Sequence, residues 1–192
     1  MTHYKKNDHY HQLAKEEGFV ARSAYKLQEI QKKFKVIKRG DKVLDLGCAP
    51  GAWSQVVLPL VGREGVLVGI DYEAVDLKAP NARFLKMDAF KIEANTLPEA
   101  PFDCVLSDMA PKTSGIKVRD QALSAELCIK AMEVCDTMLK KGGFLVIKLF
   151  EGEDAKRVEE EIQKRFQSLK RFRPQSTRQA SYEIYLIAGN KK

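Results

Sequence analysis

Short apolar runs alternate with stretches of helical periodicity along most of this chain. Strands are predicted at 42–46, 65–71, 82–86, 102–108 and 144–150, followed by a closely spaced pair at 169–173 and 182–188. Helices are predicted where apolar residues recur at helical spacing, over 21–34, 52–61, 121–139 and 154–166. The run at 65–71 is almost wholly apolar, which is typical of a strand covered on both faces.

The alternation of strands and helices predicts an α/β fold with a mostly parallel seven-stranded sheet and helices on both faces. The closing pair of strands has a short link, so we expect one antiparallel strand beside its neighbours. No repeat or linker divides residues 1–192, which indicates a single domain. Residues 1–18 are polar without a clear period, and we expect them to form an N-terminal arm.

The first strand runs into a glycine loop and then a helix that begins near Ala52. Glycine lets a ligand approach the backbone closely, and open α/β sheets bind ligands at this edge. The loop from Gly47 to Gly51 reads G-x-x-x-G, without the middle glycine of a dinucleotide loop or the lysine of a P-loop. A nucleotide-like ligand without a pyrophosphate is therefore favoured, and an ordinary tight turn is the alternative.

Acidic residues occur in or just after four successive strands: Asp45, Asp71, Asp88 and Asp108. Four carboxylates at one edge disfavour phosphates and favour a cofactor with a sugar, an adenine and a positive charge, which describes S-adenosylmethionine. Asp71 can accept the ribose hydroxyls, Asp88 the adenine amino group, and Asp108 can face the sulfonium end. Any one of them alone could be a solvated loop acid. Trp53 either packs on the sheet or forms a wall of the cleft.

The net charge of +7 is concentrated at the two ends of the chain. Residues 1–42 carry +6 and residues 164–192 carry +7, whereas the middle carries −6. Basic segments of this kind indicate a polyanionic partner, of which nucleic acid is the commonest, although lysine-rich faces also aid solubility.

The four cysteines form no C-x-x-C pair, and all three histidines lie within the first dozen residues. This spacing argues against a metal site and favours buried, reduced thiols. Neither a signal peptide nor a run of 18 apolar residues is present. We therefore expect a cytoplasmic protein without a membrane partner.

Two charged residues interrupt apolar strands near the end of the chain. Lys148 lies within FLVIKLF and Glu183 within SYEIYL, where each is either functional or close to solvent. The strand that ends at Asp108 is expected beside the Lys148 strand, which would place these two residues together. Lys26 lies away from the apolar stripe of its helix, so its pattern alone predicts a solvated lysine.

The chain resembles the FtsJ family of ribosomal RNA 2′-O-ribose methyltransferases over nearly its full length. The resemblance rests on five motifs: Ser23–Leu27 (SAYKL), Asp45–Trp53 (DLGCAPGAW), Leu106–Pro111 (LSDMAP), Val146–Phe150 (VIKLF) and Ser181–Tyr185 (SYEIY). It implies a Rossmann-like methyltransferase fold with S-adenosylmethionine as cofactor. The family's catalytic Lys-Asp-Lys-Glu tetrad falls on Lys26, Asp108, Lys148 and Glu183, and its cofactor positions fall on Gly51, Trp53, Asp71, Asp88 and Asp108.

The resemblance further implies methylation of a uridine ribose in the A loop of 23S ribosomal RNA, on the assembled large subunit, by a monomer. Lys148 would either take the hydroxyl proton or stabilise the developing alkoxide. The alternatives are a methyltransferase for tRNA or another RNA, and a non-catalytic RNA-binding assembly factor. A dehydrogenase is a more distant alternative.

Overall fold

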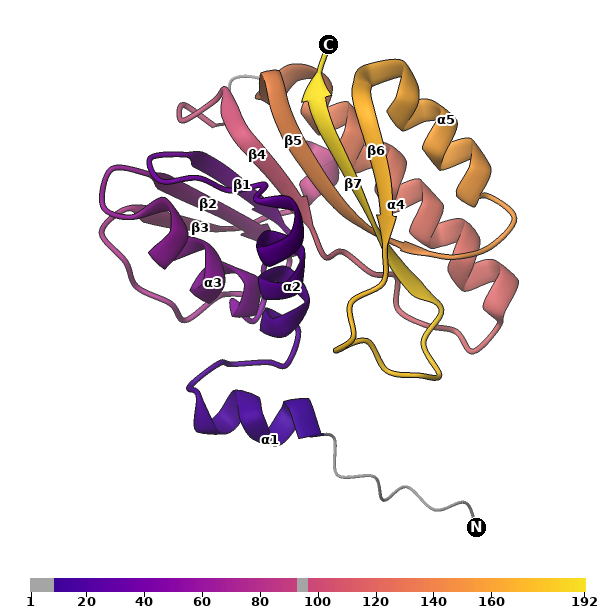
Figure 1. The fold of residues 1–192 in the computed structure, drawn as a ribbon, viewed down its shortest axis with the longest axis horizontal. Helices are drawn as coiled ribbons and strands as arrows, with labels where there is room; N and C mark the ends of the chain where they lie inside the picture. The colour runs from indigo at the N-terminus through magenta and orange to yellow at the C-terminus, as the bar shows by residue number, and fades with distance from the viewer. Residues whose placement is uncertain (1–8, 93–96) are drawn as a thin grey trace.

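One seven-stranded sheet forms the centre of the computed structural model, which describes residues 9–92 and 97–192 (Figure 1). The strand order is β3-β2-β1-β4-β5-β7-β6. The strands are β1 (Lys42–Leu46), β2 (Val66–Asp71), β3 (Ala82–Lys86), β4 (Phe102–Ser107), β5 (Leu139–Phe150), β6 (Phe166–Phe172) and β7 (Glu183–Lys191). β7 runs antiparallel to both of its neighbours, β5 and β6, and the other strand pairs are parallel, so the prediction of a mostly parallel sheet with one antiparallel strand is confirmed.

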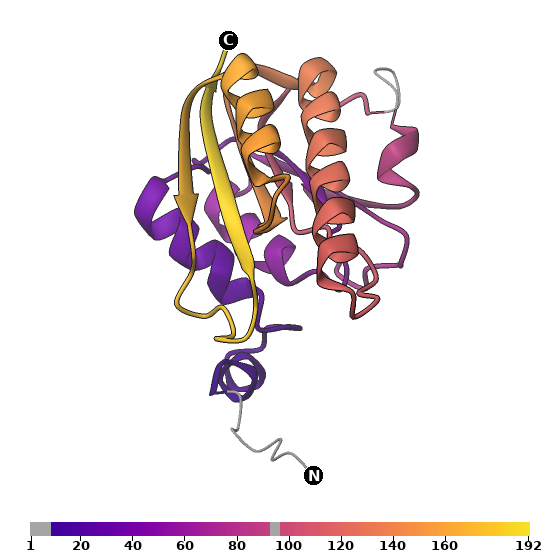
Figure 2. The ribbon, with the colours of Figure 1, turned by 90° about the vertical axis from the view of Figure 1, so that its right-hand side faces the viewer.

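Helices cover both faces of the sheet, as predicted (Figure 2). The helices near the sheet are α2 (Ala24–Phe34), α3 (Ala52–Val61), η1 (Ala89–Lys91), α4 (Lys117–Met138) and α5 (Ala155–Arg165). One apolar core lies under α2 and α3, and the other lies under α4 and α5. Among the described residues, no helix has both the length and the apolar character needed to cross a bilayer.

Residues His9–Glu16 form a helix, α1, where the sequence led us to expect a polar arm. Tyr10, Leu13 and Ala14 lie on one side of it, and the Tyr10 ring packs 5.4 Å from the ring of Tyr25. Three weakly apolar positions in a short segment give little periodic signal, so the sequence pattern did not indicate this helix. Residues 1–8 of the predicted arm lie outside the described part of the chain.

Several predicted boundaries also differ from the structure; for example, α4 begins at Lys117 rather than residue 121, and β6 begins at Phe166 rather than residue 169. Residues 140–143, between the predicted helix over 121–139 and the predicted strand at 144–150, are part of β5, whose register against β4 shifts between Phe102 and Cys104. The helix expected from residue 21 begins at Ala24, because residues 21–23 form a turn. The Ser23 carbonyl in that turn accepts a hydrogen bond from the indole of Trp53, at 2.9 Å.

The register of the central strands determines which polar residues meet at the carboxyl edge. Ser107 of β4 pairs with Ile147 of β5, so Asp108 and Lys148 occupy adjacent positions one residue further on. On its other side, Lys148 pairs with Tyr185 of the antiparallel strand β7. The predicted proximity of Asp108 and Lys148 is therefore confirmed.

The four cysteines, Cys48, Cys104, Cys128 and Cys135, are buried free thiols, as expected. Burial raises the pKa of Cys128 to about 12, and it also raises the pKa of the other three. The cysteines therefore act as small apolar core residues, because a thiol rather than a reactive thiolate is present at neutral pH.

Candidate active site

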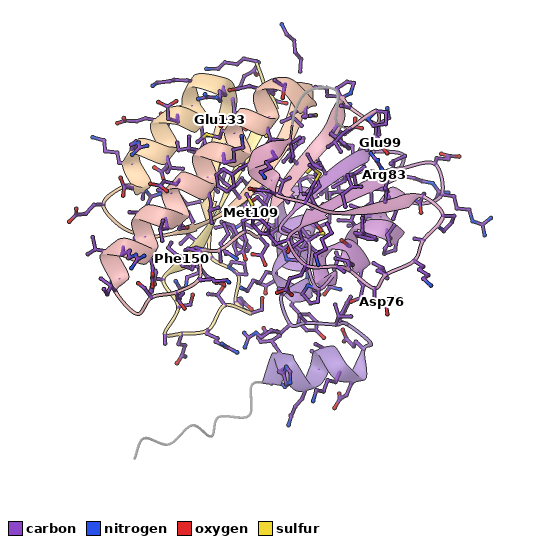
Figure 3. All side chains as sticks on the ribbon, turned by 180° about the vertical axis from the view of Figure 1, so that it is seen from behind. Asp76, Arg83, Glu99, Met109, Glu133 and Phe150 are labelled. Carbon is purple, nitrogen blue, oxygen red and sulfur yellow. The ribbon has the colours of Figure 1, made fainter. Side chains whose placement is uncertain are left out.

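The loop after β1 needs glycine for its conformation and for its contacts. Gly47 has a φ of +74°, and a Cβ on it would lie 2.8 Å from Cγ of Met109, which is labelled near the centre of Figure 3. Gly51 has a φ of +108° at the start of α3, and a Cβ there would lie 3.0 Å from Val75. Larger side chains at these positions would separate the loop from the segments that close over it.

A cavity of about 240 Å³ lies at the carboxyl edge of the sheet, beside this loop. Residues that end or follow β1, β2, β3 and β4 all contribute to its wall, among them Gly47, Asp71, Met87 and Asp108. The rest of the lining is mostly apolar. A small, mainly apolar cavity with two carboxylates can hold a ligand that presents hydroxyl groups and a positive charge.

Two of the predicted cofactor acids are held by backbone hydrogen bonds. Asp71 accepts from the N–H groups of Ala49 and Glu73, each at 2.9 Å, and its oxygens keep lone pairs for further donors. Asp88 accepts from the N–H of Phe90 at 2.8 Å, and a hydrogen bond from Tyr72 lowers the pKa of Asp88. Asp71 lines the cavity, whereas Asp88 lies between two residues that do.

Trp53 is only 2% exposed and lies in the core between α2 and the sheet. Its ring is 5.7 Å from that of Tyr185. Of the two environments considered for Trp53, the structure therefore shows packing on the sheet. Neither Trp53 nor Gly51 is among the residues that line the cavity.

Lys26, Asp108, Lys148 and Glu183 form two ion pairs near the cavity. Lys148 Nζ donates to the Asp108 carboxylate at 3.0 Å and also to the Asp108 carbonyl, and Lys26 pairs with Glu183. Lys148 is 8% exposed, so its ion pair is shielded from solvent on most sides. The four residues come from α2, β5, β7 and the end of β4.

Tyr185 connects the two ion pairs, and the sequence analysis gave it no role. Its hydroxyl donates to the same Asp108 oxygen at 2.8 Å, and Lys26 Nζ lies 5.9 Å from its ring centroid. Burial raises the pKa of Tyr185, so the hydroxyl remains a donor at neutral pH. Tyr185 lies two residues after Glu183, and this spacing on one strand face was the available signal.

Known proteins resemble this chain over nearly its full length. The sequence profile of FtsJ-like methyltransferases matches residues 19–191. This chain belongs to the FtsJ-like methyltransferase family. A relative from Desulforapulum autotrophicum, named ribosomal RNA large subunit methyltransferase E, is 48% identical over 100% of this chain and 97% of its own. A protein of the same name from Bdellovibrio bacteriovorus is 43% identical over 98% of this chain and 99% of its own.

A solved structure supports the same assignment for the fold of this FtsJ-like methyltransferase. The crystal structure of a Plasmodium falciparum protein, described as a ribosomal RNA methyltransferase, superposes with a TM-score of 0.80 at 28% identity. The match covers 90% of this chain and 98% of the other. The recognition of the family and the prediction of a Rossmann-like methyltransferase fold are therefore confirmed.

Asp45 of this FtsJ-like methyltransferase is a buried acid inside β1. The Ser54 hydroxyl donates to one of its oxygens at 2.9 Å, and the other oxygen has no hydrogen-bond partner in the described part of the chain. Burial, together with the charges of Asp108 and Asp71, raises the pKa of Asp45 from 3.8 to about 7. The sequence grouped Asp45 with the strand-end acids, but it lies beneath the loop and does not line the cavity.

The raised pKa of Asp45 predicts a specific dependence of stability on pH. Between about pH 4 and pH 7 the unfolded chain has an ionised Asp45 while the folded chain keeps it protonated, so the free energy of unfolding falls as pH rises. This pKa difference lowers the free energy of unfolding by about 4 kcal/mol at most. When unfolding in urea is measured at pH 5, 6, 7 and 8, Asp45→Asn should lack this fall in the free energy of unfolding.

Asp76→Asn is the matched control, because Asp76 is an exposed loop acid (Figure 3). Its pH profile should follow that of the unmodified protein. Parallel profiles for Asp45→Asn and the unmodified protein would show that Asp45 is ionised in the folded state throughout this range.

Proposed function

We propose that this protein transfers a methyl group from S-adenosylmethionine to the 2′-oxygen of a uridine ribose in the A loop of 23S ribosomal RNA. We further propose that it acts in the cytoplasm as a monomer on the large ribosomal subunit. The observation that carries the proposal is the pairing of Lys148 with Asp108 at the edge of a cavity, with Lys26 and Glu183 beside them. The names of the relatives support ribosomal RNA as the substrate.

The residues around the cavity fit S-adenosylmethionine. Asp71 has acceptors for ribose hydroxyls, and the bare backbone at Gly47 leaves room for a ligand where a Cβ would meet Met109. Asp88 would accept a hydrogen bond from the adenine amino group, and Asp108 would face the sulfonium end. Gly51 and Trp53 would support the loop without lining the cavity. When bound, this cofactor supplies an electrophilic methyl group on a sulfonium.

The chain's own residues would then position and activate the ribose hydroxyl. Lys148 is the group that would hold the 2′-oxygen, because its Nζ is fixed by the backbone carbonyl and by one carboxylate oxygen of Asp108. As a neutral amine it would take the hydroxyl proton, and as an ammonium it would instead stabilise the negative charge that develops on the oxygen. Holding the reacting atoms in line supplies several kcal/mol of the rate acceleration.

The basic ends of the chain support an RNA substrate. Cations that would contact the phosphate backbone occur in both end segments: Lys5, Lys6, Arg22, Lys32, Lys33, Lys35, Lys38, Arg39, Lys170, Arg171, Arg173 and Arg178. Lys5 and Lys6 lie outside the described residues. Contacts of this kind fix the position of the RNA without reading its bases.

Transfer of tritium from labelled S-adenosylmethionine tests the proposal directly. Large ribosomal subunits that lack the modification, tRNA and capped RNA would be compared side by side. We expect label in the large subunits, at a dinucleotide that resists alkaline hydrolysis because its 2′-oxygen is methylated. Label in tRNA alone would redirect the assignment to another RNA, and no label in any substrate would favour a non-catalytic binding factor.

A further inference from the structure

Two large apolar side chains are exposed at the start of α4, in the segment that follows Asp108. Ile116 is 60% exposed and Val118 is 67% exposed, and neither belongs to an apolar core of the described chain. Single apolar residues are common on protein surfaces, but covering two such neighbours removes apolar area from water and favours binding. We call Ile116 and Val118 the exposed pair and ask what covers it.

Hydrogen bonds hold the exposed pair in one backbone conformation. The Asp120 carboxylate, on a residue that is 1% exposed, accepts from the N–H and from the hydroxyl of Ser114, each at 2.8 Å. The Ser114 hydroxyl accepts from the N–H of Ile116 at 3.2 Å, and the Ile116 carbonyl accepts from the N–H of Asp120 at 3.0 Å. A ligand that covers this segment therefore meets an ordered backbone, which lowers the entropic cost of binding.

The start of α4 is also fixed against the end of β5, the strand that carries Lys148. The N–H of Phe150, which is labelled beside α4 in Figure 3, donates to the Ser124 hydroxyl at 3.0 Å. The side-chain amide of Gln121 donates to the carbonyl of Glu151. These bonds set the position of the first turns of α4 relative to Lys148.

Lys117 connects the exposed pair to the other end of the tetrad. It lies between the two members of the pair, and its Nζ is 5.5 Å from the ring centroid of Tyr182. Tyr182 immediately precedes Glu183, and its ring packs edge to face against that of Phe150 at 4.9 Å. The exposed pair is therefore at the rim of the site that contains the tetrad.

The charge around the exposed pair restricts the chemistry of its partner. Residues 112–119 are exposed throughout and include Lys112, Lys117 and Arg119 but no acid. A partner that covers the pair must present an apolar surface with negative charge close by. A nucleobase in RNA has this combination, because its faces are apolar and phosphates lie on both sides of its ribose.

We infer that the exposed pair covers the base of a nucleotide next to the ribose that is methylated. The inference rests on the proposed function. Apolar side chains that insert beside a base hold it out of its stack, and a base held here would keep the neighbouring ribose at Lys148. The contact would accept any base, because every base presents an apolar face.

The test compares Ile116→Ser and Val118→Ser with Val20→Ser, which changes an apolar residue of 54% exposure in the turn before α2. Binding of a labelled oligoribonucleotide that spans the target loop, and methyl transfer to large subunits, would both be measured. We expect each change in the exposed pair to weaken RNA binding and raise KM about fivefold, with kcat and cofactor affinity within about twofold. Val20→Ser should match the unmodified protein.

Two further measurements separate a base contact from a loss of structure or of phosphate contacts. Ile116 directly precedes the first residue of α4, where serine is a favoured helix cap, so Ile116→Ser should melt at a temperature no lower than that of the unmodified protein. The slope of log affinity against log salt should stay the same, because an apolar contact releases no counterions. A smaller slope would overturn the inference.

Abasic nucleotides show whether a base is the occupant. The base on the 5′ side of the target, and then the base on its 3′ side, would be removed from the oligoribonucleotide. The unmodified protein should bind one of these RNAs about fivefold more weakly than the intact RNA, whereas Ile116→Ser should bind both equally. Losses that add in full for both abasic RNAs would overturn the inference. Normal binding of free RNA by the serine variants, with a raised KM for large subunits, would also overturn it, because a ribosomal protein would then be the occupant.

The two proposals fail in different ways. Base-dependent RNA binding through Ile116, without methyl transfer to any substrate, would support the base contact and contradict the proposed function. Methyl transfer to large subunits with an unchanged KM in both serine variants would do the reverse.

Discussion

Replacing Lys148 by alanine is expected to abolish methyl transfer while the protein still binds S-adenosylmethionine. Lys148 would be the group that meets the 2′-oxygen, yet it does not line the cavity that contains Asp71. Loss of a group that moves a proton or stabilises charge in the transition state lowers kcat by about 10²- to 10⁴-fold. Single-turnover methyl transfer and calorimetric titration of the cofactor measure the two effects separately.

The sheet provides a matched control for this variant. Lys140 pairs with Asp103 on the same two strands, β5 and β4, but at their amino ends. Lys140→Ala removes the same kind of ion pair and should leave kcat unchanged. Near-normal turnover in Lys148→Ala would remove Lys148 from the chemistry.

Lys148→Arg distinguishes the two roles left open for this residue. Arginine keeps the positive charge and remains protonated at any accessible pH. If the charge alone matters, the arginine variant should recover part of kcat relative to alanine. If Lys148 must accept a proton, the two variants should be equally inactive.

Much of the site was predictable because the carboxyl ends of parallel strands meet at one edge. The order of β4 and β5 follows from the alternating pattern, and this order places Asp108 beside Lys148. Acids that end strands could likewise be placed near the loop at Gly47. The inference needed only the period of the strands and the topology of α/β sheets.

The partnership of Lys26 with Glu183 could not be predicted from the pattern. It depends on how α2 crosses the sheet next to β7, and this is set by the packing of Leu27, Trp53 and Tyr185 in one apolar core. Lys26 alone has the pattern of a solvated lysine, so only the resemblance to a family identified it. The burial of Asp45 was missed for a similar reason, because its depth beneath the loop is a tertiary property.

Asp108 is expected to be the residue whose loss damages both cofactor binding and methyl transfer. It lines the cavity, and one of its oxygens accepts from Lys148 at 3.0 Å and from Tyr185 at 2.8 Å. In Asp108→Ala the buried Lys148 keeps only the backbone carbonyl of residue 108, and the fully buried Tyr185 hydroxyl loses its acceptor, which costs about 3–5 kcal/mol of stability. That variant can therefore lose activity by unfolding.

Asp108→Asn separates the site from the fold, because asparagine keeps the shape and one acceptor oxygen but removes the charge. We expect kcat to fall at least about 100-fold and the cofactor Kd to rise about tenfold, since a hydrogen bond to a charged group contributes about 1.5–3 kcal/mol. Asp103→Asn, five residues earlier in the sequence, is the control and should change neither quantity. An unchanged cofactor Kd in a folded Asp108→Asn protein would limit Asp108 to holding Lys148, because its charge would then contribute nothing to the cofactor cavity.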